Sequence, residues 1–185
     1  MLSEGADKVP SVWVPDKKKL VKICLHSQGK DVETAWAEDL GEATVSPGAR
    51  FVRLGNVPFL YAKPTYGDVL VVVPDPVYNK LTWNSEGLPF ERIVDDGGRY
   101  AVILDYELVP RGSDPQPAFS ALDVAGENAN VSVEGCYGPT AERPGRVYLA
   151  VPYAMTTAAL LAYFDDQNLP LSLTLVHPVG DPSAN

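Results

Sequence analysis

The residues from Tyr100 to His177 alternate between two hydrophobic periods, and this alternation constrains the fold more than any other feature of the sequence. A strand places every second side chain on one face, whereas a helix repeats every 3.6 residues. Strand-like periods occupy residues 100–109, 131–137, 146–153 and 171–177. Helical periods occupy the segment between the first and second of these runs and the segment between the third and fourth. The resulting order, strand–helix–strand and then strand–helix–strand, is that of the ferredoxin-like βαββαβ arrangement.

Both helical stretches begin at a residue that can cap a helix. Asp114 precedes Pro115, a pair that favours an N-cap followed by a first-turn proline, and Thr156 can cap the second helix. Each helix has one apolar stripe that it cannot bury alone, so we expect two matched strand–helix–strand units to cover each other's apolar faces. The stripes are formed by Ala118, Leu122, Ala125 and Ala129, and by Thr157, Leu160, Leu161 and Phe164.

The first half of the chain has shorter strand-like runs, separated by Gly, Pro, Asn and Asp. This spacing favours a small, strongly bent antiparallel β-sheet or partial barrel. We therefore predict an α+β protein in which this sheet is followed by a ferredoxin-like βαββαβ unit. The predicted bounds are 1–19 for a polar leader whose order the sequence leaves open, 20–98 for the barrel-like unit, 99–178 for the ferredoxin-like unit and 179–185 for a tail.

The stretch from Leu54 to Pro76 begins and ends like a strand but is interrupted by Pro58, Pro64 and Gly67. Prolines do not donate ladder hydrogen bonds, so the segment must turn the chain between two strands. In one interpretation its aromatic residues plug an end of the barrel, and structure alone accounts for every residue. In the other, Tyr61, Tyr66 and Asp68 are exposed as a recognition edge, since Tyr is favoured at protein contacts.

The net charge of −9 is unevenly distributed along the chain. Residues 1–30 are basic, with Lys17–Lys19 as a cluster, whereas residues 31–99 and 100–185 are acidic. An acidic body repels phosphate backbones, which disfavours nucleic acid as a partner. It attracts a basic partner and speeds the encounter with it, although acidic surface also serves solubility alone.

Searches for catalytic patterns find no strong candidate. The only histidines are His26 and His177, no nucleophile elbow or phosphate-binding glycine loop is present, and no metal-ligand spacing occurs. Cys24 and Cys136 lie in strand-like runs, where we expect free and unreactive thiols. The first residues do not resemble a signal peptide, and no apolar run is long enough to span a membrane.

Two acidic pairs are candidates for a binding role. Asp105 and Glu107 alternate on one strand face and could act as an acid–base pair, contact a basic partner, or simply belong to an exposed face. Asp165 and Asp166 lie near a predicted helix C-terminus, where the macrodipole disfavours carboxylates. A placement that stability does not favour can indicate function, although a solvated helix end explains it too.

Four short motifs occur in an order that resembles a bacterial family known only as domain of unknown function 4265. They are Trp36-Ala37-Glu38, Leu54-Gly55-Asn56-Val57-Pro58-Phe59, Tyr66-Gly67-Asp68-Val69-Leu70 and the arginine-containing run Phe90–Val94. The resemblance covers roughly residues 20–178. It implies a small bacterial, cytoplasmic protein, and it carries over no catalytic residues.

These observations favour a non-catalytic protein-binding module, such as an immunity-type protein that neutralises a basic toxin or effector. The alternative is a small-molecule sensor or enzyme that uses a cleft between the two units, near Trp36, Tyr61, Tyr66 and Asp105. We expect no cofactor, no metal and no membrane or nucleic-acid partner. The candidate partner-binding residues are Trp36, Glu38, Tyr61, Tyr66, Asp68, Asp105, Glu107, Asp165 and Asp166.

Overall fold

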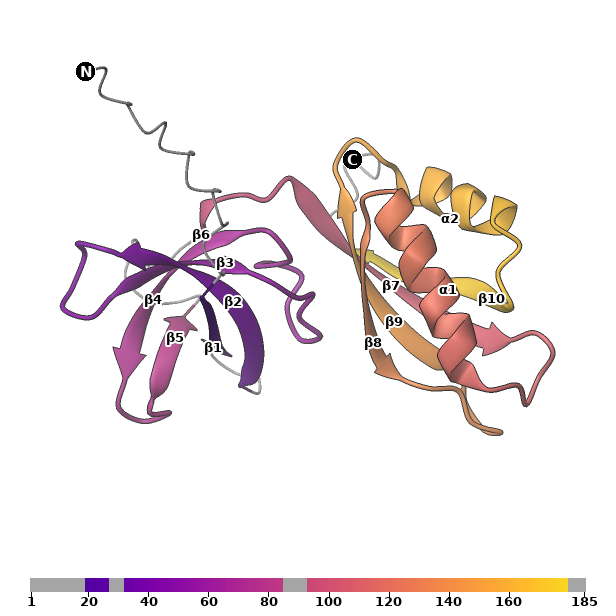
Figure 1. Ribbon diagram of the computed structural model, residues 1–185, viewed down its shortest axis with the longest axis horizontal. Coiled ribbons are helices and arrows are strands. Elements are labelled where there is room, and N and C mark those ends of the chain that lie inside the picture. The colour runs from indigo at the N-terminus through magenta and orange to yellow at the C-terminus, as the bar shows by residue number, and fades with distance from the viewer. Residues whose placement is uncertain (1–18, 27–31, 85–92, 180–185) are drawn as a thin grey trace, which may run out of the picture.

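The computed structural model describes residues 19–26, 32–84 and 93–179, and it is a mixed α+β fold with mostly strands and two helices. Two sheets lie side by side, and both helices cover one face of the second (Figure 1). The predicted leader (except Lys19), the tail beyond Val179 and the start of the Phe90–Val94 run lie outside the described residues.

The first sheet is built from six strands, and five of them close into a barrel. Its order is β3-β2-β1-β5-β4-β6, and an additional β3–β4 pairing completes the ring. The strands are β1 (Leu20–His26), β2 (Glu33–Glu42), β3 (Arg50–Leu54), β4 (Val69–Asp75), β5 (Lys80–Asn84) and β6 (Ile93–Asp95).

The expectation of a purely antiparallel first sheet is wrong at one pairing. β1 and β5 run parallel, with Ile23 opposite Leu81 and His26 opposite Asn84. The other pairs are antiparallel. In a closed ring of five strands, not every neighbouring pair can be antiparallel. If the strand direction alternates along the ring, the first and the fifth strand run the same way, because five is an odd number. A closed five-stranded meander therefore requires this parallel contact.

Alternation of side chains fills the barrel. Ile23 and Leu25 from β1, Ala35 and Ala37 from β2, and Trp83 from β5 point inward and are almost completely buried. Their neighbours along each strand point outward. Some residues are buried without following this alternation: the whole apolar run Val69–Val72 is buried, and so are Cys24 and Thr82.

The second sheet has four antiparallel strands in the order β10-β7-β9-β8. In chain order its elements are β7 (Arg99–Leu108), α1 (Pro115–Asn128), β8 (Ser132–Tyr137), β9 (Gly145–Pro152), α2 (Thr157–Asp166) and β10 (Leu171–Val179). The strand–helix–strand repeat expected from the two periods is therefore present, with the first strand of each repeat in the centre of the sheet.

The predicted caps and stripes occupy their expected places. Asp114 accepts a hydrogen bond from the Gln116 N–H, and Thr156 Oγ1 accepts one from the Ala159 N–H. One core joins both helices to the sheet through Leu122, Leu160 and Phe164, which are almost completely buried. Leu173 of β10 packs against the same core.

Candidate functional site

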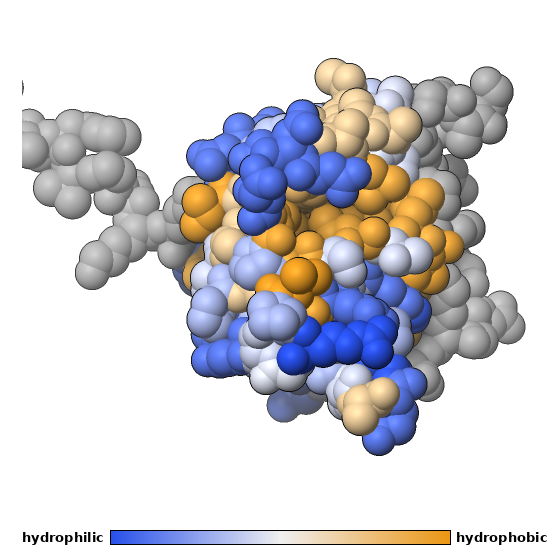
Figure 2. Space-filling view, turned by 90° about the vertical axis from the view of Figure 1, so that its right-hand side faces the viewer, coloured by the Kyte–Doolittle hydropathy of each residue, from blue (hydrophilic) through white to orange (hydrophobic). Residues whose placement is uncertain are grey.

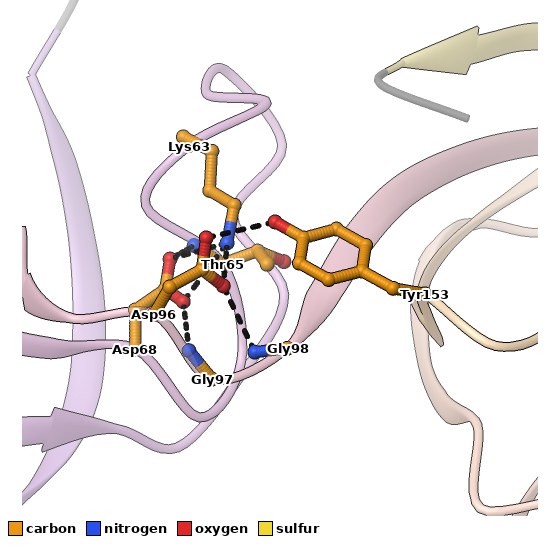
Figure 3. A network of polar contacts seen from close by, with 7 residues as sticks. All are labelled: Lys63, Thr65, Asp68, Asp96, Gly97, Gly98 and Tyr153. Carbon is orange, nitrogen blue, oxygen red and sulfur yellow. Dashed lines mark hydrogen bonds and ion pairs between the residues drawn. The ribbon is translucent and has the colours of Figure 1, made fainter. Parts of the chain in front are cut away.

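A closed network of charged side chains lies at the junction of the two sheets (Figure 3). Lys63 comes from the β3–β4 connection, Asp96 from the β6–β7 turn and Tyr153 from the turn before α2. Lys63 Nζ lies 3.0 Å from Asp68 Oδ1 and 2.8 Å from Asp96 Oδ1. The Tyr153 hydroxyl donates to Asp96 Oδ2 at 2.8 Å. Segments distant in sequence are thereby fixed to one another.

Asp68 is the anchor of this network and is completely buried. Besides Lys63, its carboxylate accepts hydrogen bonds from the backbone N–H groups of Thr65 and Gly97, each at 2.8 Å. Gly97 is required here because a Cβ atom would lie 2.6 Å from the carbonyl carbon of Gly67. The two glycine turns therefore touch backbone to backbone, and the carboxylate accepts the hydrogen bond of the Gly97 N–H at this contact.

The charges of this network stabilise one another. We call Lys63, Asp68, Asp96 and Tyr153 the clamp, because they join the two sheets. Burial acts to lower the pKa of Lys63, but hydrogen bonds to Asp96 and Asp68 outweigh it and raise the pKa above its ordinary value. Burial acts to raise the pKa of Asp96, and the bonds from Lys63 and Tyr153 reverse this and lower it. Lys63 is therefore held as an ammonium ion, which suits neither a nucleophile nor a base.

A cavity of about 330 Å³ opens beside this clamp, between the β3–β4 connection and the second sheet. Asn56 and Tyr66 line one side, and Arg99, Asp123 and Glu134 line the other. The Arg99 guanidinium lies 5.3 Å from the centre of the Tyr66 ring and donates to the Asn130 side-chain oxygen at 2.7 Å. Burial raises the pKa of Glu134, and the nearby charges of Asp123 and Glu33 add to the effect.

A larger hollow of about 670 Å³ lies at the far end of the second sheet, between the loops that follow β7 and β8. Arg111 and Glu107 lie on one side of it, and Thr140 and Arg143 on the other. Arg111 Nη2 is 2.7 Å from Glu107 Oε2, and Arg143 stacks on Tyr137 at 4.2 Å. Both arginines are thus engaged by their own loops.

The expectation that Tyr61 and Asp68 form an exposed recognition edge is not met. Tyr61 is buried in the barrel, where its hydroxyl donates to the Leu25 carbonyl and its ring packs edge-on to Trp83. Asp68 is withdrawn into the clamp. Only Tyr66 of that predicted edge reaches a cavity, and it lines the cleft beside Arg99. The interpretation of this segment as a structural plug therefore accounts for Tyr61 and Asp68.

The remaining candidates are separated over the molecule. Trp36 is 51% exposed on the outer face of β2, with Lys22 Nζ 5.4 Å from its ring, and Glu38 beside it pairs with Arg53. On the second sheet Asp105 pairs with Arg146 and Glu107 with Arg111. Asp165 and Asp166 are exposed at the end of α2. Trp36 and Asp105 do not line the cleft between the sheets, contrary to the alternative prediction.

The other candidate chemistries find little support in the described part of the chain. Cys24 and Cys136 are both free; Cys24 is buried, and Cys136 is half-buried with its pKa raised by burial, so its thiol stays protonated. Among the described residues, no group of three or more His, Cys, Asp and Glu side chains could hold a metal ion. No helix within these residues is long and apolar enough to cross a bilayer.

Three of the motifs that carry the family resemblance contact one another in the barrel. The Trp36 N–H donates to Asn56 Oδ1 at 2.9 Å, and the Gly55 N–H donates to the Trp36 carbonyl at 2.8 Å. The Gly67 N–H donates to the Leu54 carbonyl at 2.9 Å. These motifs therefore position the β3–β4 connection, and a structural role explains their residue types.

Sequence reasoning missed Lys63, Arg99 and Glu134. Lys63 stands alone between Ala62 and Pro64, and Arg99 follows a glycine pair that predicts only a turn. No periodic pattern marks them, because their partners come from other segments. An isolated cation in an acidic stretch was the only available signal.

No protein-family model and no curated protein matches this chain. Among solved structures, it is similar to a hypothetical protein from Neisseria gonorrhoeae, with a TM-score of 0.40 and 10% sequence identity. The match covers 88% of this chain and 96% of that one.

Proposed function

We propose that this chain is a non-catalytic protein-binding module that neutralises a basic partner, as an immunity protein neutralises a toxin or effector. The observation that supports this most is a surplus of carboxylates that the fold does not neutralise. Nine Asp and Glu residues and four arginines lie between Arg99 and Val179. Two of the arginines, Arg146 and Arg111, form ion pairs with Asp105 and Glu107 respectively. The surplus attracts and orients a basic protein.

The proposal also agrees with the chemistry of the clamp. Its lysine is held protonated and its carboxylates accept hydrogen bonds from within the network, so this polar cluster serves to fix the two sheets together. A rigid scaffold of this kind loses little conformational entropy on binding. We further propose a cytoplasmic location, as the family resemblance implies.

Two finer assignments belong to the same proposal. The chain order and the sheet order β10-β7-β9-β8 support a ferredoxin-like unit for residues 99–178. The hydrogen bonds of Trp36 with Asn56 and of Gly67 with Leu54 support membership of the domain of unknown function 4265 family, because they give three separated motifs one shared structural task.

Co-purification tests the main proposal. The tagged chain is incubated with native lysate at low salt, captured proteins are identified, and the best candidate is purified and mixed with the chain. We expect a basic protein that forms a 1:1 complex in analytical ultracentrifugation. Raising the salt from 50 to 500 mM should weaken the complex at least about tenfold, because screening removes the charge attraction. Acidic partners only, or no stoichiometric complex, would refute the proposal.

The cleft between the sheets supports a second candidate function, the binding of a small polar molecule. Its volume of about 330 Å³ is at the lower end of ligand sites, and its lining holds both a cation, Arg99, and two carboxylates, Asp123 and Glu134. Such an arrangement suits a zwitterion with an amine and a carboxylate. Isothermal titration with the common amino acids tests it. Micromolar binding that Arg99→Ala abolishes would favour this function, and binding unaffected by that substitution would exclude the cleft.

A further inference from the structure

We infer that the outer face of α1 and α2 is the docking surface, and that its occupant is a basic amphipathic helix of the partner protein. This inference rests on the proposed function and adds where the partner binds and what kind of segment it presents.

The two helices form one continuous layer. Both bury their apolar stripes in the same core, and the Tyr163 hydroxyl of α2 donates to the Ala125 carbonyl of α1 at 2.9 Å. They cover one face of the second sheet and turn their other side away from it (Figure 1). Their outward side chains therefore belong to a single surface.

This surface carries exposed apolar side chains. Val124 of α1 is 56% exposed, and Ala158, Ala159 and Ala162 of α2 are exposed as well. Viewed from the side that carries the helices, apolar side chains gather in the middle, with hydrophilic ones above and below (Figure 2). Alanines project little, so the backbone of a second helix can approach closely and bury Val124.

The charge of the layer has one sign. The helices carry Asp123, Glu127, Asp165 and Asp166, and they contain no lysine or arginine. Asp123 and Glu127 line the cleft that also holds Arg99, whereas Asp165 and Asp166 are exposed at the end of α2 and supply the charge of the outer face. Among the ion pairs of the described residues, these four carboxylates take no part.

Three of these carboxylates also stand where a helix disfavours them. Glu127, Asp165 and Asp166 lie in the last turn of their helices, and neither last turn holds a basic residue. The negative end of the macrodipole repels a carboxylate there. A lysine or arginine of a partner protein offsets both the repulsion between these carboxylates and their repulsion by the helix dipole. An anionic partner adds to both.

These features together specify the occupant. Positive charge alone would satisfy the carboxylates but leave Val124 in water. A helix with an aliphatic stripe at i, i+3, i+4 and i+7 and lysines beside the stripe satisfies both. The docking surface thus fits the helix-in-groove mode, with charge selecting the partner.

A model peptide tests the surface directly. The probe is a synthetic helix of about 18 residues, roughly 27 Å long, with leucines on one face and lysines on the other. Titration of the ¹⁵N-labelled chain at low salt should shift the amide signals of α1 and α2. A matched peptide with serine in place of leucine should bind several-fold more weakly, because it buries no apolar surface.

Paired charge reversals supply the control. The double variant D165K/D166K should weaken peptide binding about tenfold or more, since two attractions become repulsions. The double variant E42K/D95K makes the same charge change at exposed barrel positions and should alter binding less than about twofold. Val124→Ser, at an exposed position that leaves the core intact, should weaken binding measurably.

The outcomes separate this inference from the proposed function. Equal weakening by both double variants, or amide shifts on the barrel, would overturn the docking surface and leave a basic partner for the chain in place. Absence of any stoichiometric basic partner in the co-purification would instead overturn the function on which the surface depends. Shifts confined to the helices, lost only in D165K/D166K, would support the surface.

Discussion

At the scale of single residues, Asp68 determines how the two sheets are joined. Its buried carboxylate accepts hydrogen bonds from three groups, the Lys63 ammonium and the backbone N–H groups of Thr65 and Gly97, and Thr65 is completely buried. Leaving buried donors without an acceptor costs more than a lost surface contact, because the donors have already given up their water.

Asp68→Ala should therefore lower the free energy of unfolding by about 3 kcal/mol. The measurement is urea denaturation followed by circular dichroism, compared with Asp95→Ala. Asp95 is exposed, so that control should change stability by less than about 0.5 kcal/mol. A loss below about 1 kcal/mol in Asp68→Ala would show that the clamp does not hold the sheets together.

At the scale of helices and strands, the sequence was most informative where a period was long. The repeat of helix and strand after Tyr100 was predictable because each element has one apolar face and recognisable capping residues. The parallel β1–β5 pair was not predictable, since two short apolar runs do not indicate which strand each will pair with. The clamp could not be predicted from the sequence either, because Lys63, Asp96 and Tyr153 are far apart in the chain and contact one another only in the folded protein.

The N-cap of α2 offers a test at this scale. Thr156→Ala removes the acceptor of the Ala159 N–H and should cost about 1 kcal/mol of stability. Thr156→Ser retains the hydroxyl and should cost a smaller amount. Urea denaturation of the two variants checks the order. Equal losses would mean that the threonine methyl group, and not the cap, is what matters.

At the scale of the whole molecule, Asp39 makes stability depend on pH. Burial acts to raise the pKa of Asp39, but hydrogen bonds from Arg50, Lys19 and the Gly41 N–H outweigh it and lower the pKa to about 2 from 3.8. A lowered carboxyl pKa contributes stability that is complete above the unfolded value and is lost as the pH falls toward the folded value. The loss from Asp39 therefore falls between about pH 4 and pH 2.

Asp39→Asn should flatten this part of the stability curve, as urea midpoints measured from pH 2 to pH 7 will reveal. Glu134 does not obscure the test. Its pKa is raised from 4.5, so its effect has the opposite sign and lies at higher pH, where stability increases as the pH falls. An Asp39→Asn curve parallel to that of the native chain below pH 4 would contradict the assignment.

The parallel pairing of β1 with β5 has a consequence for synthesis on the ribosome. The barrel cannot close until residue 84 has emerged, so β1 waits through some sixty residues with one edge unsatisfied. An unpaired edge strand readily recruits strands of other chains. Nascent fragments that stop short of β5 should for this reason aggregate, whereas those that extend past it should stay dispersed.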